Sequence, residues 1–461
     1  MRFNLFITLS KYARRFGAFA SRSRILFVER FPALRHCLFF ERIVNGRIVP
    51  LANCQKRLRP IMPRFVPFPL FGRRPVLTLA GLVVLAPFIG PRLFQKWSSA
   101  ETVLAADDSQ DSPAPSNSDE SSASGQADLA PQEPTVTDTG YTEWVAFRER
   151  FITPDGRVID TGKGGISHSE GQGYGLLFAE AFGDAETFRR IYEWTTSHLR
   201  RDDNALHMWR YDPAAADPVA DPNNATDGDI MIAAALSRAG RRWHRPELIR
   251  AARAIAHDID RLLTRQVGQR MVLLPGLRGF ETADAVIINP SYYAFNALTE
   301  INTLISSARL RRVQTDGYAL IREGRFGRWQ LPPDWLSISR RDGTLAPAPR
   351  WPARFSYDAI RVLLYLTEAG LTVPGLRASF TAYWNEKPGF HPAWVDLCTG
   401  EIAPYPASPG IQAVADFFLR ANGEQLASAS VPPAELPTIN AQTDYYSAAL
   451  IVLTYLSWRG L

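Results

Sequence analysis

Apolar residues in the C-terminal two thirds of the chain recur in long runs with the period of helices. Amphipathic segments with arginine-rich outer faces lie between these runs, for example at 184–201 and 246–265. Neighbouring apolar runs begin roughly 35–65 residues apart, which leaves room for one returning helix between each pair. Six such runs stand out: residues 173–182, 230–240, 292–305, 359–369, 411–421 and 445–458.

This alternation predicts an all-α fold, an (α/α)6 barrel in which six outer helices surround six inner helices. The inner helices would run parallel, so their N-terminal ends would gather on one rim. An irregular helical bundle remains an alternative on the pattern alone. Polar residues of the kind that cap helices precede most of the inner segments: Ser169, Thr226, Ser291, Ser356 and Thr443.

Charge is distributed unevenly along the 461 residues, whose formal net charge is +6. Residues 1–100 carry a net charge of +16, residues 101–140 carry −9, and the remainder carries −1. Because the basic charge is confined to the N-terminal region, it gives no support to nucleic-acid binding by the folded body.

The N-terminal region contains a short apolar run at 76–89, directly behind Arg73 and Arg74. A membrane-spanning helix needs about 20 residues, so this run is short for one. Small residues follow at 98–100, and the pattern is typical of a secretory signal at 62–100, with an uncleaved anchor as the alternative. We therefore expect a periplasmic or secreted protein that meets a membrane only through this segment.

The same pattern suggests a division of the chain into regions. Since a signal sequence normally begins a protein, we expect translation to start at Met62, with residues 1–61 an upstream overcall or a basic extension. Residues 62–106 would form the signal or anchor region. Residues 107–139, rich in Asp, Ser and Pro, predict a disordered acidic linker. Residues 140–461 would form the barrel.

Three carboxylates lie at or just before the N-termini of three inner segments. They are Glu170 in SHSEGQGYG, Asp227 in ATDGD and Asp358 in FSYDAIR. The barrel would bring these ends together over one cleft, and glycoside hydrolysis requires two such carboxylates, an acid and a partner that activates water or attacks directly. The alternative is that each stabilises its own helix terminus through the helix dipole.

Other polar residues near these motifs have simpler interpretations. Thr226 and Asp229 have the spacing of a capping box, so we expect Asp229 to cap its helix. The glycines that follow Glu170 would let backbone and ligand approach closely. A phosphate site is disfavoured because GQGYG lacks a lysine and follows no strand. We expect His168 to occupy a loop position with a satisfied hydrogen bond.

The three cysteines, Cys37, Cys54 and Cys398, show no metal-ligand spacing, so we expect neither metal nor cofactor.

Three strings, SEGQGYG, ATDGDIMIAAALSRAGRRW and SYDAIR, resemble the motifs of glycoside hydrolase family 8, the cellulase D family, and the resemblance covers roughly residues 141–461. It implies an (α/α)6 barrel that hydrolyses β-1,4-glucan, xylan or chitosan with inversion. It also implies that Glu170 is the general acid and Asp358 the general base. Asp227 would bind and distort the substrate and hold Glu170 protonated.

The expected activity is that of an endo-1,4-β-glucanase, or cellulase, acting on internal bonds of a β-1,4-glucan. The alternatives are a xylanase or chitosanase of the same family, or a non-catalytic protein that guides glucan chains. Signal and barrel together resemble the periplasmic family members associated with bacterial cellulose synthase, which makes that machinery a candidate partner. Residues near the motifs are the expected sugar contacts: Tyr174, Trp209, Tyr292, Tyr357, Arg361 and Tyr445.

Overall fold

The computed structural model describes residues 41–44, 47–50, 139–421 and 436–460. The chain forms two compact units, Met1–Asp128 and Leu129–Leu461. In the first unit, β1 (Glu41–Val44) and β2 (Arg47–Pro50) form an antiparallel hairpin. Apart from this hairpin, the expected extension at 1–61, signal region at 62–106 and linker at 107–139 lie outside the described residues, which resume at residue 139, where α2 starts. Within the described ranges, no helix is long and apolar enough to cross a membrane.

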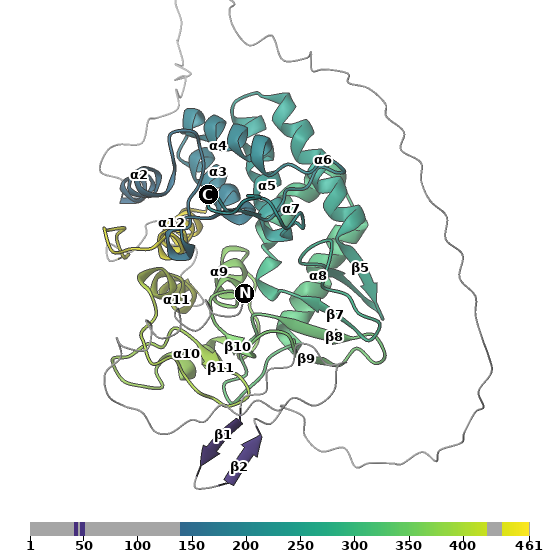
Figure 1. Cartoon of the computed structure of the whole chain (residues 1–461), viewed down its shortest axis with the longest axis vertical. Coiled ribbons are helices and arrows are strands. Elements are labelled where there is room, and N and C mark those ends of the chain that lie inside the picture. The colour runs from purple at the N-terminus through teal and green to yellow at the C-terminus, as the bar shows by residue number, and fades with distance from the viewer. Residues whose placement is uncertain (1–40, 45–46, 51–138, 422–435, 461) are drawn as a thin grey trace, which may run out of the picture. The chain divides into compact units, whose positions relative to one another are not determined.

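The second unit is a helical barrel, which confirms the predicted fold class (Figure 1). Each inner helix packs against the next, and the last packs against the first, so the ring is closed. The inner helices are α3 (Ser169–Ala181), α5 (Thr226–Arg242), α7 (Phe295–Ile305), α9 (Ile360–Glu368), α11 (Pro409–Ala421) and α12 (Tyr445–Arg459). Those packed outside them are α2 (Thr139–Phe151), α4 (Ala185–His198), α6 (Pro246–Leu262), α8 (Ala308–Glu323) and α10 (Leu376–Trp384). The sixth expected outer helix would fall between α11 and α12, where residues 422–435 lie outside the described part.

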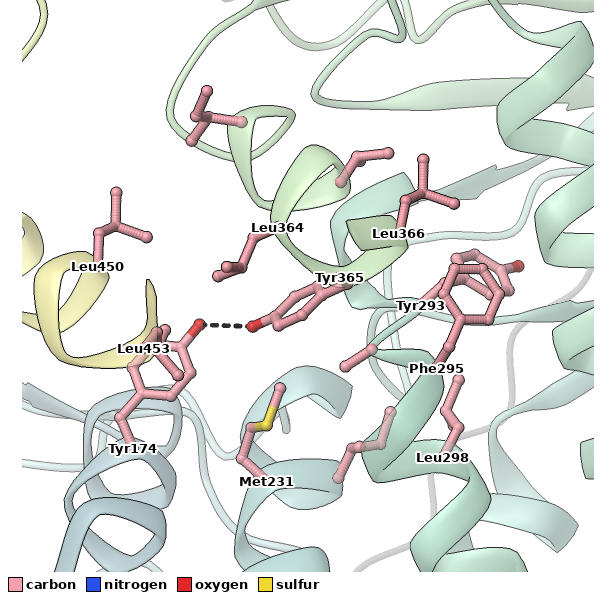
Figure 2. Close-up of a cluster of buried hydrophobic side chains, with 14 of the residues drawn as sticks. Tyr174, Met231, Tyr293, Phe295, Leu298, Leu364, Tyr365, Leu366, Leu450 and Leu453 are labelled. Atoms are coloured by element: carbon pink, nitrogen blue, oxygen red, sulfur yellow. Dashed lines mark hydrogen bonds between the residues drawn. The ribbon is translucent and has the colours of Figure 1, made fainter. Parts of the chain in front are cut away.

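Burial distinguishes the two rings. The inner helix α5 buries consecutive residues on all its faces, whereas the outer helix α6 buries one stripe that includes Leu248, Ala252, Ile255 and Ile259. Side chains from five inner helices meet inside the ring, among them Tyr174, Met231, Phe295, Tyr365 and Leu453 (Figure 2). The apolar run at 230–240 therefore corresponds to a helix that is covered on every side.

Helices α3 and α5 approach closely because glycines face each other across their interface. A Cβ atom on Gly228 would lie 2.3 Å from Ser169 Oγ, and one on Gly173 would lie 2.7 Å from the Met231 Cβ. These glycines serve helix packing, and so does Gly175, whose added Cβ would lie 2.9 Å from a Val158 methyl carbon. For Gly173 and Gly175, the expectation that these glycines make room for a ligand was therefore wrong.

The five polar residues expected to cap inner helices do not cap them. His168 caps α3 and Asp444 caps α12, accepting hydrogen bonds from Gly171 N and Ser447 N. Thr226 is itself the first residue of α5, and its hydroxyl donates to the Leu274 carbonyl at 2.7 Å. The hydroxyls of Ser291, Ser356 and Thr443 likewise pair with side chains from neighbouring segments, those of Asn289, Asp334 and Asn440.

Short antiparallel strands connect the helices, in segments whose residue pattern shows few strand signals. The pairs are β3 (Ser167–His168) with β4 (Arg210–Tyr211), β5 (Thr264–Val267) with β6 (Arg270–Leu273), and β10 (Arg354–Phe355) with β11 (Val395–Asp396). A three-stranded sheet contains β7 (Ala285–Ile288), β8 (Leu336–Ser339) and β9 (Leu345–Pro347). The amphipathic segment 246–265 ends as a helix at Leu262 because its last residues enter β5.

Candidate active site

A cleft of about 810 Å³ opens where several inner helices begin. The first turns of α3 and α5 contribute Glu170 and Asp227, and the segment before α9 contributes Asp358. The structure thus brings together the three predicted catalytic carboxylates, which are 57 and 131 residues apart along the chain. Two single-turn 3-10 helices, η1 (Thr161–Lys163) and η2 (Pro290–Tyr292), complete part of the rim.

Glu170 is held by the strand and the cap that precede it. The strand β3 pairs with β4, with His168 opposite Arg210. His168 Nδ1 accepts a hydrogen bond from the backbone N–H of Gly171 at 3.0 Å, so Nε2 carries the proton and faces Asp160 Oδ2 at 3.3 Å. This arrangement confirms the structural role expected of His168 and fixes the first turn of α3.

Asp227 is the second residue of α5 and is 5% exposed. Its Oδ1 accepts a hydrogen bond from the adjacent Gly228 N–H at 2.8 Å. Asp229 does not cap the helix, contrary to expectation, because its carboxylate is bonded elsewhere. It accepts hydrogen bonds from the backbone N–H and the ring of His207, at 2.8 and 2.9 Å, and ties the segment before Trp209 to α5.

Arg361, in the first turn of α9, links all three carboxylates. Its Nη2 donates to Asp358 Oδ1 at 2.6 Å, while Nη1 contacts Glu170 Oε1 and lies 3.6 Å from Asp227 Oδ2. The side chain is almost fully buried, so these ion pairs are poorly screened by solvent. Sequence reasoning expected Arg361 to contact sugar, but its guanidinium forms the floor of the cleft and spaces the carboxylates.

Burial and neighbouring charges shift the pKa values of Glu170 and Asp227 in opposite directions. Burial, the largest single influence, would raise the pKa of Glu170, but the positive charges of Arg361, His168 and Lys163 and a hydrogen bond with Asp227 together lower that pKa. Burial, together with the negative charge of Glu170, raises the pKa of Asp227 well above its usual value. The side chain of Asp227 also hydrogen-bonds Glu170. These opposite shifts favour a proton on Asp227 over one on Glu170, the reverse of the expected arrangement.

Aromatic side chains form the walls of the cleft. Of the expected sugar contacts, Trp209, Tyr292 and Tyr357 line it. Trp209 Nε1 donates to Asp221 at 2.8 Å, which holds the indole in place. Tyr357 is 42% exposed and presents its ring to solvent. Such rings can stack on the apolar faces of sugars.

Two expected sugar contacts are buried instead. Tyr174 is 1% exposed, lies below the cleft, and its hydroxyl accepts a hydrogen bond from Arg361 Nη1 at 3.0 Å. Tyr174 stands four residues after Glu170, so it faces the same way but one helical turn deeper in the barrel. Tyr445 contributes to the lining, but its ring is 1% exposed and packs edge-on against Phe151 and His168. Neither ring can act as a stacking platform.

Two further aromatic residues lie in the walls of the cleft, and one of them, Trp335, was not predicted as a site. Trp335 lies in the loop before β8 and stacks on Trp351, with ring centroids 4.6 Å apart. Tyr446, in the first turn of α12, also lines the cleft. A signal for Trp335 exists in the sequence, since a tryptophan after two prolines in a loop is poorly placed to join a helical core, but it is remote from every motif.

Metal coordination finds no support in the part of the chain that the structure describes. No group of three or more His, Cys, Asp or Glu side chains there has the arrangement of a metal site. At the centre of the cleft, the guanidinium of Arg361 supplies the positive charge among the carboxylates.

Comparison with known families assigns the barrel. The sequence model described as "Glycosyl hydrolases family 8" matches residues 130–460. The chain belongs to glycosyl hydrolase family 8. The matched range contains every residue that lines the cleft, and it confirms the resemblance carried by the three motifs.

Relatives in family 8 support this assignment over most of their own length. A protein named "Probable endoglucanase" from Novacetimonas hansenii is 46% identical over 338 residues, which cover 73% of this chain and 94% of that protein. An "Endoglucanase" from Cellulomonas uda is 40% identical, covering 60% of this chain and 77% of that protein. The solved structure of an endo-beta-1,4-glucanase from Acetobacter xylinum matches with a TM-score of 0.64 and 45% identity, covering 69% of this chain and 98% of that one. Family 8 membership makes the protein a glycoside hydrolase.

Proposed function

We propose that this protein is an inverting endo-1,4-β-glucanase that cleaves internal bonds of a β-1,4-glucan. The observation that carries the proposal is the placement of three carboxylates around Arg361 on the floor of an aromatic-walled cleft. The relatives named as endoglucanases support glucan as the substrate. The cleft volume lies in the upper part of the range, about 300–1,000 Å³, that holds small-molecule ligands, which suits a chain segment of more than one sugar.

In this proposal Glu170 and Asp358 perform the two proton transfers. Glu170 protonates the oxygen of the leaving sugar as the bond from that oxygen to C1 breaks. A water molecule attacks C1 from the opposite face and gives a proton to Asp358, so the anomeric configuration inverts. Arg361 binds the two carboxylates through different nitrogens, which keeps them apart and leaves room for the attacking water.

Asp227 supplies the proton that Glu170 lacks in the unliganded enzyme. Burial and the charge of Glu170 raise the pKa of Asp227, which favours its protonated form, and its hydrogen bond to Glu170 provides a direct route for transfer. Substrate in the cleft would exclude water and bring the glycosidic oxygen to Glu170, so the shared proton can pass to the sugar. Asp227 is therefore a proton reservoir in this scheme, as well as a substrate contact.

Charges near the cleft favour a neutral polysaccharide over cationic chitosan. The remaining acids that line it are already engaged: Asp160 binds the first turn of η1 and faces His168, while Asp444 caps α12. The catalytic carboxylates share Arg361. The described lining therefore offers no acid free of a hydrogen-bond or ion-pair partner to bind an ammonium group.

Viscosity measurements test the proposal. Residues 107–461 should rapidly reduce the viscosity of carboxymethylcellulose and leave soluble xylan and chitosan unchanged, with Glu170→Gln as the inactive control. Hydrolysis of xylan or chitosan in preference to the cellulose derivative would reassign the substrate. Binding of the cellulose derivative without hydrolysis would indicate a protein that only guides glucan chains.

We also propose export, with a role beside cellulose synthase. The support is the apolar run at 76–89 behind two arginines and the resemblance to periplasmic family members associated with cellulose synthesis. Fractionation of cells expressing the full chain should recover the barrel outside the cytoplasm. Retention in the cytoplasm would refute export. In a cellulose-producing host, deletion of the gene should alter cellulose yield, and complementation with the Glu170→Gln variant should not restore it.

A further inference from the structure

The start of α9 places Asp358 but has no capping side chain of its own. Ala359 precedes the helix and makes no side-chain hydrogen bond to it. A helix start leaves several backbone N–H groups without partners, and such groups are costly when buried. Ser356 and Ala359 are both buried, so their N–H groups require partners from another part of the chain.

Asp334, in the loop before β8, provides those partners. Its Oδ1 accepts hydrogen bonds from Ser356 N at 2.9 Å and from Ala359 N at 2.8 Å, and its Oδ2 accepts one from the Ser356 hydroxyl. The two backbone groups lie on either side of Asp358. The side chain of Asp334 is 8% exposed, and its own backbone N–H donates to the Arg354 carbonyl at 2.7 Å.

We propose that Asp334 is a positioning residue for Asp358, holding the turn 356–359 so that the Asp358 carboxylate faces the attacking water. This inference rests on the proposed function, in which Asp358 is the general base. Asp358 is otherwise held by a single ion pair to Arg361, and its side chain is 29% exposed. Without Asp334 the turn could rotate, and a displacement of about 1 Å at a catalytic group can cost roughly 100-fold in rate.

Asp334 is a titratable group as well as a hydrogen-bond acceptor, so the test must separate its charge from its hydrogen-bonding geometry. Burial, followed by the charge of Asp358, raises the pKa of Asp334 to about 7. Besides Asp358, the titratable groups influenced by Asp334 are the phenols of Tyr383 and Tyr446. Both N–H groups bind the same oxygen, Oδ1, and an asparagine retains such an oxygen. An amide at this position can therefore preserve the turn, whereas an alanine cannot.

The test compares Asp334→Ala with Asp334→Asn in the full barrel, using steady-state kinetics on carboxymethylcellulose. We expect Asp334→Ala to lower kcat by about 10- to 100-fold with KM changed less than about threefold. Asp334→Asn should restore kcat to within about fivefold of the parent enzyme. A kcat for Asp334→Ala within twofold of the parent would overturn the proposal, and so would an Asp334→Asn variant as slow as the alanine variant.

Two further variants keep the outcome decisive. If Asp334→Ala fails to fold, Ser356→Ala removes only the hydroxyl contact and should lower kcat by about two- to fivefold at constant KM, whereas an unchanged kcat would count against the proposal. Asp358→Asn separates the two hypotheses. If Asp358→Asn is inactive while Asp334→Ala is normal, only the positioning role fails. If Asp358→Asn retains full activity, the proposed catalytic function itself is wrong.

Discussion

The hydroxyl groups of Tyr174 and Tyr365 lie 3.1 Å apart inside the barrel (Figure 2), and the Tyr174 hydroxyl also accepts a hydrogen bond from Arg361. The pair joins α3 to α9, the helices that carry the proposed acid and follow the proposed base. Tyr174 is thus the buried partner that holds the guanidinium in place, and the ring itself stacks on Phe178.

Tyr174→Phe should lower both stability and kcat. The change leaves the apolar ring but removes one acceptor of Arg361 Nη1, which also contacts Glu170, and the loss of a partner for one N–H of a buried charged donor costs about 1–3 kcal/mol. Thermal unfolding and kinetics on carboxymethylcellulose would measure the two effects, and we expect kcat to fall about tenfold. Tyr365→Phe is the matched control, since it removes one hydroxyl that does not touch Arg361. Equal losses in kcat for the two variants would contradict a specific role for Tyr174.

Gly228→Ala should separate α3 from α5 at the cleft. The added methyl group would lie 2.7 Å from Glu170 N as well as against Ser169, so the first turn of α3 must move. Overpacking of this kind costs about 1–3 kcal/mol, and the displaced Glu170 should also reduce kcat. Gly240→Ala in the same helix is the control, because its methyl group would meet Ile249 at the other end. We expect that variant to be destabilised but to keep its kcat, and a similar loss of kcat in both would refute the argument.

The proposed proton reservoir predicts how leaving groups affect the variants. General acid catalysis contributes about 100- to 10,000-fold, but an aryl leaving group that needs no proton does not require it. Asp227→Asn and Glu170→Gln should therefore be strongly impaired on cellulose derivatives and much less impaired on dinitrophenyl β-cellobioside. Asp358→Asn should be impaired on both, because it affects the water. Release of dinitrophenol measures this directly, and an Asp227→Asn variant without recovery would exclude a role in proton supply.

Glu368, the last residue of α9, should make stability depend on pH. It faces a second cavity, of about 240 Å³, and burial raises its pKa to about 7 from 4.5. Below pH 4.5 the residue is protonated whether the chain is folded or unfolded. As pH rises from 4.5 to 7, the unfolded chain loses a proton that the folded chain retains, so stability falls by at most about 3 kcal/mol and stays lower above pH 7.

Glu368→Gln removes this dependence. The variant should unfold a few degrees higher than the parent protein at pH 8 and show no such gain at pH 4.5, by thermal unfolding. Glu300→Gln is a control of opposite sign, because the pKa of Glu300 is lowered through its hydrogen bonds, mainly to Arg241, despite burial. Stabilisation by Glu368→Gln that is the same at both pH values would argue against titration of this carboxyl.

The sequence predicted the barrel and the three carboxylates because both depend on local patterns. Long apolar runs that are separated by amphipathic segments favour alternating inner and outer helices, and parallel inner helices place their first turns together. The role of Arg361 could not be predicted in this way, since its contact with Glu170 joins residues 191 positions apart. Asp229 was misassigned because two residues after Asp227 the helix faces the other way, toward His207.

Aromatic residues were the least predictable part of the site. Proximity to a motif does not decide which side of a helix a ring occupies, so Tyr174 and Tyr445 were assigned to the cleft although their rings are buried. Trp335 reaches the cleft through the packing of a loop far from any motif. Only the tertiary structure determines such positions.

The floor of the cleft and two of its wall residues come from different kinds of structure. The groups tied to Arg361 occupy rigid helix starts or the turn directly before one, whereas Trp209 and Trp335 sit on connecting segments outside the ring. Exchange of those segments between homologues can therefore alter which polysaccharide is recognised while the reaction chemistry is inherited unchanged. For engineering, the barrel is a scaffold whose selectivity can be redesigned separately from its catalysis.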